Sequence, residues 1–311
     1  MKVLLLGYSD IAKRRVLPAL RSLGAAVDIA SRSTAAIESS GRWFRDYDTA
    51  ISQTDAELVY ISTVNNGHAQ WTRRALEAGR HVAVDKPAFL TLEETHQLLE
   101  LADRRRLCLA EATVYGYHPQ CAMVREVFRE AGATPTRLIA AFSVPPLSPQ
   151  NFRYRAELGG GALWDLGPYA VTPGRIFFES PPSGIHAWRL SANDEVDTSF
   201  SMVGVYPDGR SCIGSFGYTT GYINRLDIIG PGVVVTMDRA FSPPPDLPMR
   251  LTVRRLNQVT AIEVPPSDSF RLFFDHLFSA IQGRNDRSFS QHLLADAEAL
   301  HHLRESAFQV Y

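Results

Sequence analysis

Short apolar runs alternate with amphipathic stretches over the first third of the chain. Runs of strand length cover 2–6, 26–30, 58–62, 81–84 and 107–111, and helical periodicity begins near Ile11 and His68 and again covers 92–105. Parallel strands need a crossover between them, and helices of this kind supply right-handed crossovers. The pattern therefore predicts a Rossmann-type, doubly wound parallel sheet in the N-terminal part.

The pattern changes after Tyr117, where longer alternating runs are separated by glycine and proline turns. These runs cover 136–144, 198–205, 209–217, 224–237 and 250–264, and helices are predicted from about Phe270 and again from Gln291. Alternation with a period of two is typical of antiparallel strands with one buried face. We expect an α/β protein with a Rossmann domain over 1–117 and an α+β domain over 118–311 that carries a mostly antiparallel open sheet. Because an uncovered sheet face needs a partner, we also expect a homo-oligomer formed by the second domain.

The first predicted strand runs into a turn at Gly7 that opens a helix. Gly7, Ser9 and Ala12 stand where dinucleotide-binding turns carry three glycines, and Asp10 and Ile11 lie between them. Such turns place backbone N–H groups and a helix dipole against a pyrophosphate. Ala12 is a tolerated variant, whereas the side chain of Ser9 stands where a phosphate approaches the backbone. These five residues are therefore candidate cofactor-binding residues, and a tight turn without a ligand is the alternative.

The second predicted strand ends at Ser31 and Arg32, about twenty residues beyond the glycine turn, where the ribose of a dinucleotide is recognised. An acidic residue here binds the ribose diol of NAD, whereas a hydroxyl and a positive charge suit the 2′-phosphate of NADP. The pair therefore favours NADP over NAD as the cofactor. The alternative is that Arg32 is a solvated surface residue.

Polar residues follow the third predicted strand, where a helix begins. Thr63, Asn65 and His68 are candidate cofactor-binding residues, because ligands of such sheets bind at the carboxyl ends of the strands. Thr63 and Asn65 are expected to contact the nicotinamide ribose. The alternative for Asn65 or the adjacent Asn66 is that its side chain caps the helix.

Composition and charge exclude several kinds of partner. Of 311 residues 45% are apolar, and 32 lysines and arginines nearly balance 33 aspartates and glutamates without a block of like charge. We therefore expect no nucleic-acid or membrane partner. The first apolar run is too short for a signal peptide or a membrane span. Since Cys108, Cys121 and Cys212 lack the spacing of metal ligands or of a disulfide framework, we expect a cytoplasmic protein with buried thiols and no metal site.

Two motifs indicate a known family: V-D-K-P at 84–87 and G-G-G-A-L-W-D-L-G-P-Y at 159–169. With these motifs the chain resembles, over essentially its whole length, the family of glucose-fructose oxidoreductase and inositol dehydrogenase. Within that family it looks most like the NADP-dependent sugar 3-ketoreductases that act on nucleotide-linked keto-deoxyhexoses. The stretches that carry this match are I-A-K-R-R-V-L-P-A-L at 11–20, Y-H-P-Q at 117–120, F-R-Y-R at 152–155 and R-A-F-S-P-P at 239–244.

The chain departs from the usual family pattern at three positions. Asp85 stands where most members carry glutamate before the lysine, and Val64 stands where most carry proline. Tyr169 stands where most members carry histidine, and the sugar 3-ketoreductases likewise carry tyrosine there. The third departure therefore narrows the resemblance to those enzymes.

Reduction of a ketone requires hydride at carbon and a proton at oxygen, and Lys86 and Tyr169 are the candidates for the proton transfer. A tyrosine is protonated at neutral pH and can donate, while a lysine ammonium stabilises the phenolate and polarises the carbonyl. Lys86 also counts among the cofactor-binding candidates. If 163–170 is helical, Asp165 shares a face with Tyr169 and either binds a sugar hydroxyl or steers Lys86. The alternatives are a core tyrosine, an exposed lysine and a helix-capping aspartate.

His118, Arg153 and Tyr154 complete the set of candidate substrate contacts. Arg153 and Tyr154 suit a nucleotide diphosphate and a stacking base, and a surface ion pair is the alternative for Arg153. A buried, hydrogen-bonded structural histidine is the alternative for His118.

We therefore expect an NADPH-dependent reductase of a small-molecule keto sugar, with C-3 of a nucleotide-linked keto-deoxyhexose as the reduced centre. A dehydrogenase of a free sugar, a polyol or an imine is a second hypothesis, because family members share the site and differ in substrate. A catalytically silent binding protein on a degraded Rossmann fold is the third, since Ser9, Val64 and Asp85 depart from the usual pattern.

Overall fold

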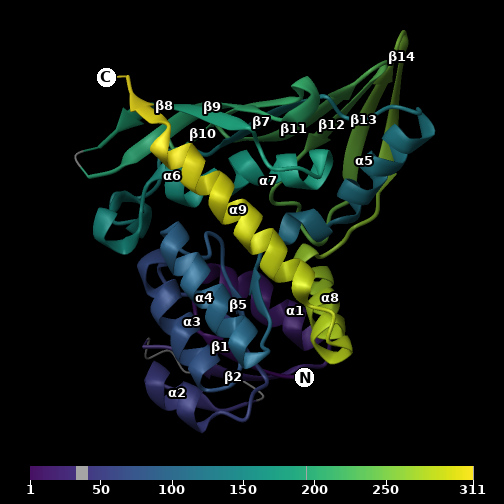
Figure 1. Ribbon diagram of the computed structural model, residues 1–311. Helices are drawn as coiled ribbons and strands as arrows, with labels where there is room; N and C mark the ends of the chain where they lie inside the picture. Colours follow the sequence, from purple (N-terminus) through teal and green to yellow (C-terminus); the bar gives the residue numbers. More distant parts are fainter. Residues whose placement is uncertain (33–40, 194, 311) are drawn as a thin grey trace. The chain divides into compact units, whose positions relative to one another are not determined.

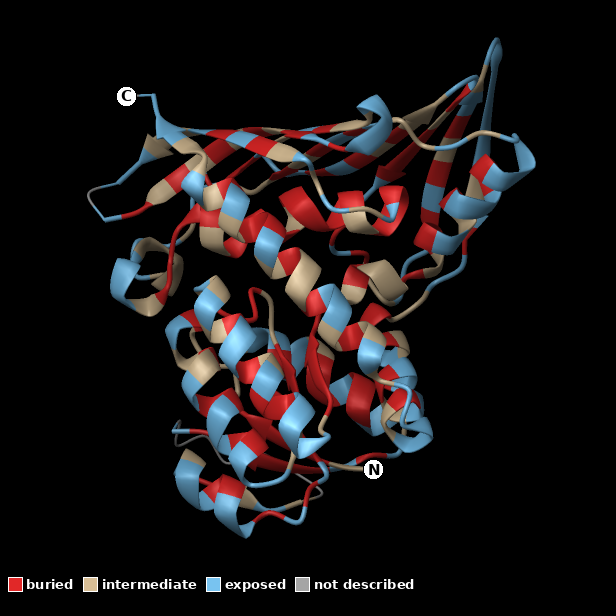
Figure 2. Cartoon of the chain, in the orientation of Figure 1, coloured by how far each residue is buried: buried red, intermediate tan, exposed pale blue. Residues whose placement is uncertain are grey.

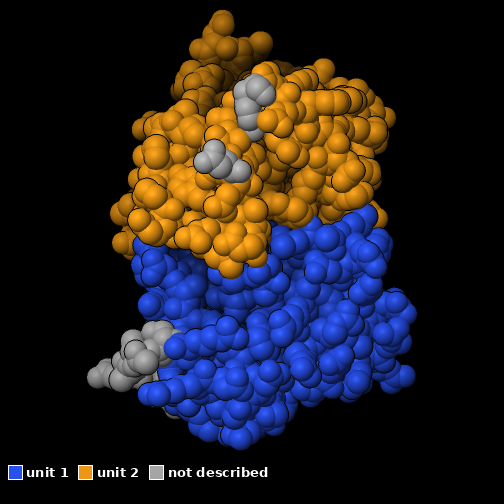
Figure 3. All heavy atoms as spheres, turned by 90° about the vertical axis from the view of Figure 1, so that its left-hand side faces the viewer, with its two compact units in different colours: residues 1–114, 270–294 blue, residues 115–269, 295–311 orange. Residues whose placement is uncertain are grey.

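The computed structural model describes residues 1–32, 41–193 and 195–310, which form two compact units (Figure 3). Unit 1 consists of Met1–Val114 and Phe270–Leu294, and unit 2 of Tyr115–Ser269 and Ala295–Tyr311. The first change of unit thus follows Val114, where the sequence predicts it after Tyr117. The return of 270–294 to unit 1 was not predicted, because periodicity indicates a helix but not the core that the helix joins. Phe274 of this segment packs edge-on against Tyr60 of the parallel sheet.

Unit 1 is built on a six-stranded parallel sheet in the order β3-β2-β1-β4-β5-β6 (Figure 1). Its strands are β1 (Lys2–Leu6), β2 (Ala26–Ala30), β3 (Trp43–Phe44), β4 (Leu58–Ile61), β5 (His81–Val84) and β6 (Leu109–Glu111). The strand order reverses beside β1, and in such sheets ligands bind outside the carboxyl ends of the strands at this point. The Rossmann-type prediction is confirmed, and its carboxyl edge is where the cofactor residues are expected.

Helices of unit 1 pack around this sheet, and all but α8 lie between its strands in the sequence. They are α1 (Leu17–Ser22), α2 (Tyr47–Gln53), α3 (His68–Glu77), α4 (Leu92–Arg105) and α8 (Ser269–Gly283), with short helical turns at Ala12–Val16 and Asn65–Gly67. The turn at Ala12–Val16 is a π-helix ahead of α1. A capping box closes the start of α4: Thr91 Oγ1 accepts from the Glu94 N–H, and Glu94 accepts from the Thr91 N–H. The helix that the sequence predicts from Ile11 therefore consists of two shorter pieces, the π-helix at Ala12–Val16 and α1.

Unit 2 is built on a nine-stranded sheet in the order β14-β13-β12-β11-β7-β10-β9-β8-β15 (Figure 1). Its strands are β7 (Arg137–Ser143), β8 (Gly184–Ala192), β9 (Asp197–Val205), β10 (Ser211–Gly217), β11 (Ile223–Gly230), β12 (Val233–Asp238), β13 (Met249–Arg255), β14 (Gln258–Val264) and β15 (Ala307–Gln309). Among the described strands of this nine-stranded sheet, only β7 with β10 and β8 with β15 pair in parallel. The prediction of a mostly antiparallel sheet is confirmed.

The helices of unit 2 lie on one side of this sheet (Figure 1). They are α5 (Pro119–Glu130), α6 (Ala162–Asp165), α7 (Gly167–Phe178) and the C-terminal part of α9 (Arg287–Glu305), with short helical turns at Val114–Tyr117, Phe152–Tyr154, Ala156–Leu158 and Pro207–Gly209. Buried and exposed residues alternate along β7, β9 and β11, as the banded colouring of the strands shows (Figure 2). One face of the sheet therefore forms the core of unit 2 with these helices.

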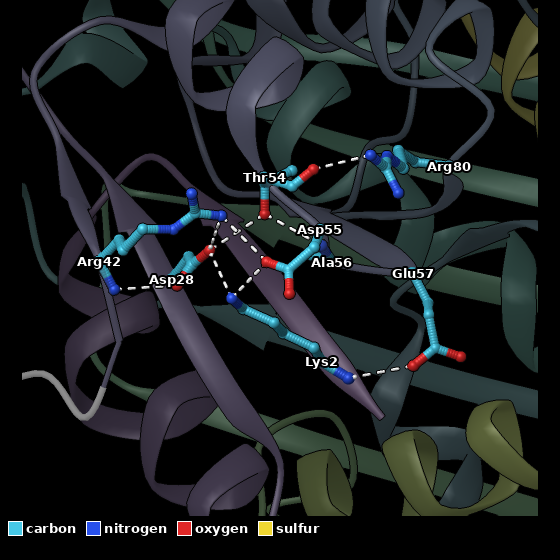
Figure 4. A network of polar contacts seen from close by, with 8 residues as sticks. All are labelled: Lys2, Asp28, Arg42, Thr54, Asp55, Ala56, Glu57 and Arg80. Atoms are coloured by element: carbon cyan, nitrogen blue, oxygen red, sulfur yellow. Dashed lines mark hydrogen bonds and ion pairs between the residues drawn. The ribbon is translucent and has the colours of Figure 1, made fainter.

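A buried carboxylate ties three segments of unit 1 together at the amino end of β1 (Figure 4). Asp28 of β2 is fully buried, and its Oδ2 lies 3.1 Å from Lys2 Nζ and 3.3 Å from Arg42 Nη2. Thr54 Oγ1 donates to the same oxygen at 3.1 Å, and the Arg42 N–H donates to Oδ1 at 2.9 Å. Burial opposes ionisation, but the hydrogen bonds from Arg42, Lys2 and Thr54 hold the pKa of Asp28 below its usual value.

None of the described helices combines the length and the apolar character that a membrane span requires. Within the described ranges, no group of three or more histidine, cysteine or acidic side chains is arranged to hold a metal ion. Cys108, Cys121 and Cys212 are buried and unpaired with one another, which confirms the expectation of buried thiols. Burial raises the pKa of Cys121 and of Cys212 to about 12.

Candidate active site

The turn after β1 admits only glycine at its first position. Gly7 has a φ of 94°, and a Cβ built on it would lie 2.3 Å from the carbonyl oxygen of Ser62. Its N–H donates to the Ala30 carbonyl at 2.9 Å, which holds the turn between β2 and β4. Ala12 is fully buried, whereas Asp10 and Ile11 are exposed at the helix start. Close backbone packing at the start of a helix is typical of turns that receive a pyrophosphate.

Ser9 stays in the turn by hydrogen bonds to its surroundings. Its Oγ accepts from the Ala12 N–H at 3.1 Å and lies 2.7 Å from Ser62 Oγ. The hydroxyl therefore satisfies one N–H group of the helix start and ties the turn to the end of β4. The side chain that departs from the glycine pattern is thus part of a defined network.

The end of β2 presents a cation on an aromatic ring. Ser31 is buried, and its N–H donates to the Phe44 carbonyl at 2.9 Å. The exposed Arg32 guanidinium carbon lies 4.9 Å from the centre of the Tyr47 ring, and Tyr47 in turn packs edge-on against Trp71. Such a cation–π contact limits the conformations of the arginine. Arg32 is therefore a partly ordered cation at the strand end rather than a freely solvated one.

The segment after β4 departs from its prediction in two respects. The cap of α3 is Gly67, without a side-chain cap, so neither Asn65 nor Asn66 caps this helix as the alternative expected. His68 is fully buried, with Nδ1 2.9 Å from the Pro87 carbonyl oxygen and Nε2 3.2 Å from that of Thr63. Burial disfavours the charged form and lowers the pKa of His68, and a neutral ring has one N–H and so donates to one of these two carbonyls.

Asp85 and Lys86 follow β5 at the same edge of the sheet. The Asp85 carboxylate accepts from the Ser62 hydroxyl at 2.5 Å and from the Tyr60 hydroxyl. Lys86 is half-buried and precedes Pro87, whose carbonyl faces His68. The shorter carboxylate in the family motif therefore has two hydroxyl partners. The carboxyl ends of β1, β4 and β5 bring Ser9, Ser62 and Asp85 together, as the fold predicts.

In unit 2, Asp165 is the centre of a buried polar cluster. Its Oδ2 accepts from Arg153 Nε at 2.8 Å and from the Tyr218 hydroxyl at 3.2 Å. The Asp165 carboxylate raises the pKa of Arg153, and burial, followed by the charge of Asp165, raises the pKa of Tyr218. Arg153 therefore forms an ion pair, which is the alternative that the sequence offers, but it is half-buried inside the cluster rather than exposed on the surface.

The triple glycine folds Arg153 back onto Asp165. The Gly161 N–H donates to the Arg153 carbonyl and the Gly160 N–H to the Arg155 carbonyl, each at 2.9 Å. A Cβ on Gly160 would lie 2.6 Å from the Arg153 oxygen. The segment F-R-Y-R and the glycine motif are thus one folded unit, which the sequence does not reveal.

Tyr169 lies in a cluster of aromatic rings. Its ring centre is 4.9 Å from that of Phe142, 5.2 Å from that of Phe241 and 6.0 Å from that of Tyr115. Tyr169 is half-buried, while the other three rings are buried. The rings fix the direction of the phenol and lower the local polarity, which is a suitable setting for a proton donor.

The expected helix over 163–170 is interrupted. Helix α6 ends at Asp165, Leu166 has φ −103° and ψ −15°, and α7 begins at Gly167. The argument that Asp165 and Tyr169 share one helical face four residues apart is therefore wrong. Asp165 contacts Arg153 and Tyr218, and Tyr169 contacts the aromatic rings.

Two motifs of the sequence analysis meet beside Tyr169. Gln120 Nε2 of Y-H-P-Q donates to the Ala240 carbonyl of R-A-F-S-P-P at 3.1 Å. Asn224 Oδ1 accepts from the Phe241 N–H at 3.0 Å, and the Asn224 carbonyl accepts from the Arg239 N–H at 2.6 Å. These bonds hold Phe241 against the Tyr169 ring. The sequence indicates both motifs, but it does not indicate that Gln120 and Asn224 join them.

The remaining candidates have structural contacts. His118 is buried and caps α5, accepting from the Gln120 N–H at 3.3 Å, which is the structural alternative. The Tyr154 hydroxyl accepts from the Leu147 N–H at 3.0 Å, and its ring packs edge-on against Tyr218. The sequence analysis does not identify Ser62, Tyr60 or Tyr218 as site residues. The position of Ser62 could have indicated it, because it directly follows a strand at the ligand-binding edge.

The two parts of the chain match two family models. Residues 1–113 match the model of an oxidoreductase family with an NAD-binding Rossmann fold, and residues 133–232 match that of the GFO/IDH/MocA C-terminal domain. A dTDP-3,4-didehydro-2,6-dideoxy-alpha-D-glucose 3-reductase of Saccharopolyspora spinosa is 30% identical over 280 residues, which covers 87% of this chain and 84% of that protein. A D-xylose 1-dehydrogenase (NADP(+)) of Haloferax volcanii is 27% identical, with 98% of each chain covered.

A solved structure matches the whole chain. It is a 3-ketoreductase from Actinomadura kijaniata in complex with NADP and TDP-benzene, and it aligns with a TM-score of 0.93 at 27% identity. The alignment covers 100% of this chain and 99% of that protein.

Proposed function

Because the chain belongs to the GFO/IDH/MocA oxidoreductase family, we propose that it is an NADPH-dependent reductase of a sugar ketone. The substrate is a nucleotide-linked keto-deoxyhexose, and C-3 is the carbonyl carbon that is reduced. The observation that carries the proposal is the match over the whole chain to a 3-ketoreductase that binds NADP and a TDP ligand. A relative that reduces a dTDP-linked keto sugar supports the same substrate class.

The cofactor is held by the carboxyl edge of the parallel sheet. Gly7 and the N–H groups of the following turn receive the pyrophosphate, and Ser31 and Arg32 receive the 2′-phosphate. Support comes from the space that only glycine leaves at residue 7 and from the Arg32 guanidinium on Tyr47. Thr63 and Asn65 contact the nicotinamide ribose. When bound, NADPH supplies the hydride that reduces the carbonyl carbon.

Tyr169 donates the proton that the carbonyl oxygen needs, and Lys86 stabilises the charge. The phenol O–H breaks as the new O–H of the product alcohol forms, and the phenolate is stabilised by the ammonium group. The aromatic rings around Tyr169 support this role, since they fix the orientation of the phenol ring. Asp165 and Arg153 form a charged pair that binds polar groups of the sugar or of its diphosphate.

The first test combines a cofactor titration with a substrate panel. We expect micromolar binding of NADPH with much weaker binding of NADH, followed by nicotinamide fluorescence, and reduction of dTDP-linked 3-keto sugars but not of the free sugars. Oxidation of D-xylose or another free sugar with NADP+ that is faster than reduction of the dTDP-linked sugars would favour the second candidate, to which the Haloferax volcanii relative points. A stable protein that binds neither NADPH nor NADH would leave the third hypothesis, a catalytically silent binding protein.

The exposed face of the nine-stranded sheet is proposed to bind a second copy of this chain. Ile139 of β7 and Ile213 of β10 are directly paired and are 40% and 44% exposed, and Val205 of β9 is 45% exposed. Apolar residues on one open sheet face are typical of an interface. A monomeric mass at micromolar concentration in light scattering would exclude this assembly.

The cytoplasm is the proposed compartment. Three buried thiols suit a reducing environment, and so does a site that reduces its substrate with a nicotinamide cofactor. Cell fractionation with an antibody against the chain would test this, and recovery outside the cytoplasmic fraction would contradict it.

A further inference from the structure

The hydroxyl of Ser62 connects two parts of the cofactor edge that are far apart in the sequence. Ser62 directly follows β4 and is 1% exposed. Its Oγ donates to Asp85 Oδ2 at 2.5 Å and lies 2.7 Å from Ser9 Oγ. A serine hydroxyl has one proton, so Ser62 must accept from Ser9 if it donates to Asp85.

The donors therefore run in one direction. The Ala12 N–H donates to Ser9, the Ser9 hydroxyl donates to Ser62, and the Ser62 hydroxyl donates to the Asp85 carboxylate. An ionised carboxylate only accepts, so the chain of hydrogen bonds ends there. Hydrogen bonds in such a series polarise one another in a site of low polarity. Loss of one hydroxyl weakens the bonds on both sides of it.

The far end of this chain adjoins Lys86. The second oxygen of Asp85 accepts from the hydroxyl of the fully buried Tyr60, whose ring packs against Phe274. On the other side of Lys86, the Pro87 carbonyl faces the buried His68 ring. Both sequence neighbours of the lysine are thus held by buried side chains, and hydrogen bonds link the Asp85 side to the glycine turn.

We propose that Ser62 is a positioning residue that couples the pyrophosphate turn to Lys86. This inference rests on the proposed function. Ser9 departs from the glycine pattern and Asp85 departs from the usual glutamate, and these two residues stand on either side of Ser62 in one hydrogen-bond chain. Through Ser62, the turn that receives the cofactor and the strand end that carries the lysine are held in register. Neither hydroxyl needs to touch a ligand for this effect.

The test is a double-mutant cycle of Ser9→Gly and Ser62→Ala. Three quantities are measured for each variant: the NADPH dissociation constant by nicotinamide fluorescence, kcat with a dTDP-linked keto sugar, and the midpoint of urea unfolding without cofactor. Ser22→Ala is the matched control, because Ser22 also loses a hydroxyl bond, to the Ala19 carbonyl, but at the end of α1. We expect the control to change only the unfolding midpoint.

Ser62→Ala removes a hydrogen bond to a charged group and should lower kcat about tenfold. Ser9→Gly cuts the same chain at a bond between two neutral hydroxyls, and because that bond polarises the next one we expect a loss of up to about tenfold. Ser62→Ala should also weaken NADPH binding about threefold to tenfold, because the turn loses its tie to β4. The double variant should match Ser62→Ala in kcat within about twofold. This non-additivity is the signature of coupling.

Effects on kcat that multiply to about a hundredfold in the double variant would overturn the inference, since the two hydroxyls would then act independently. Variants that change only the unfolding midpoint would also overturn it, because Ser62 would then be a structural residue. A wild-type protein that binds neither nicotinamide would instead remove the proposed function, and this result is reached before any variant is compared.

Discussion

Around Lys86, polar side chains hold the backbone, whereas around Tyr169, aromatic rings hold a side chain. Asp85 accepts from two hydroxyls and His68 faces two carbonyls, so the strand end is fixed by hydrogen bonds. Tyr169 instead contacts three rings that come from three other segments of unit 2. Hydrogen-bonded positions depend on single atoms, while the aromatic cluster depends on shape. The two regions should therefore respond differently to the loss of one hydroxyl.

Tyr169→Phe gives the largest effect expected from this comparison. The phenylalanine ring keeps the contacts with Phe142 and Phe241 but has no proton to donate, so kcat should fall about 100-fold to 10,000-fold. NADPH affinity and the melting temperature should change little. Steady-state kinetics and nicotinamide fluorescence measure the two effects.

Tyr206→Phe is the control for this substitution. Tyr206 is a buried tyrosine of unit 2, and its hydroxyl has no hydrogen-bond partner within the described ranges. Its removal should leave kcat unchanged. An unimpaired rate in Tyr169→Phe would remove this residue from the mechanism.

Arg32→Ala should have the next largest effect, and it tests the cofactor edge alone. Loss of a charge-assisted contact to the 2′-phosphate should weaken NADPH binding about 10-fold to 100-fold and leave NADH binding nearly unchanged. Tyr47→Leu should weaken NADPH binding less, because the guanidinium loses only the ring that orders it. Titration with both nicotinamides gives the ratio of affinities.

Tyr47→Phe is the matched control, since it keeps the aromatic ring under Arg32 and should bind NADPH as the wild type does. Equal losses of NADPH and NADH affinity in Arg32→Ala would show that Arg32 does not recognise the 2′-phosphate.

Asp165→Asn tests the charged cluster beside the aromatic one. The amide leaves the half-buried Arg153 without its carboxylate, so the free energy of unfolding should fall by about 1–3 kcal/mol, at the lower end because solvent reaches part of the guanidinium. Urea unfolding measures the loss. An unchanged midpoint would show that the pair contributes nothing to stability, and the cluster would then be open to a purely ligand-binding role.

The same comparison explains how far the sequence predicts the molecule. Strand runs and the glycine turn locate Gly7, Ser31 and Arg32 at one edge, because parallel strands place their carboxyl ends together. The aromatic cluster brings together residues from β7, α7, the helical turn at Val114–Tyr117 and one loop, and no local pattern relates them. The break at Leu166 has the same cause, since a helical spacing does not reveal the tertiary contacts that interrupt it.

Unit membership was the other property that periodicity did not predict. Residues 270–294 form helices with an apolar face, but the core of either unit could pack against such a face, so the pattern does not say which unit they join. The buried tie between Arg175 and Asp296, with two bonds of 2.7 Å, likewise joins α7 and α9 across a long stretch of sequence. Long-range pairs of this kind follow from the folded core rather than from spacing.

The smallest effect is expected at the amino end of β1, far along the strand from the Gly7 turn, where Asp28 is held by Lys2, Arg42 and Thr54. Hydrogen bonds from these partners keep the pKa of Asp28 below its unfolded value of about 3.9. The stabilisation is therefore complete above that value and is lost as the pH falls through the lower pKa of the folded state. Asp28→Asn should lower the free energy of unfolding at pH 7 by about 1–2 kcal/mol and flatten its decline below about pH 4.

Urea unfolding between pH 7 and pH 2.5 tests this, with the exposed Asp103→Asn as the control that keeps the acid decline of the wild type. NADPH affinity and kcat should stay unchanged in Asp28→Asn at neutral pH, because the network lies at the opposite end of β1 from Gly7. A variant that unfolds as the wild type does at every pH would show that the desolvation cost of the buried carboxylate cancels the stabilisation from its hydrogen bonds. A loss of cofactor affinity would instead show that the amino end of the sheet controls the turn at its carboxyl end, and the two ends of β1 would then have to be treated as one site.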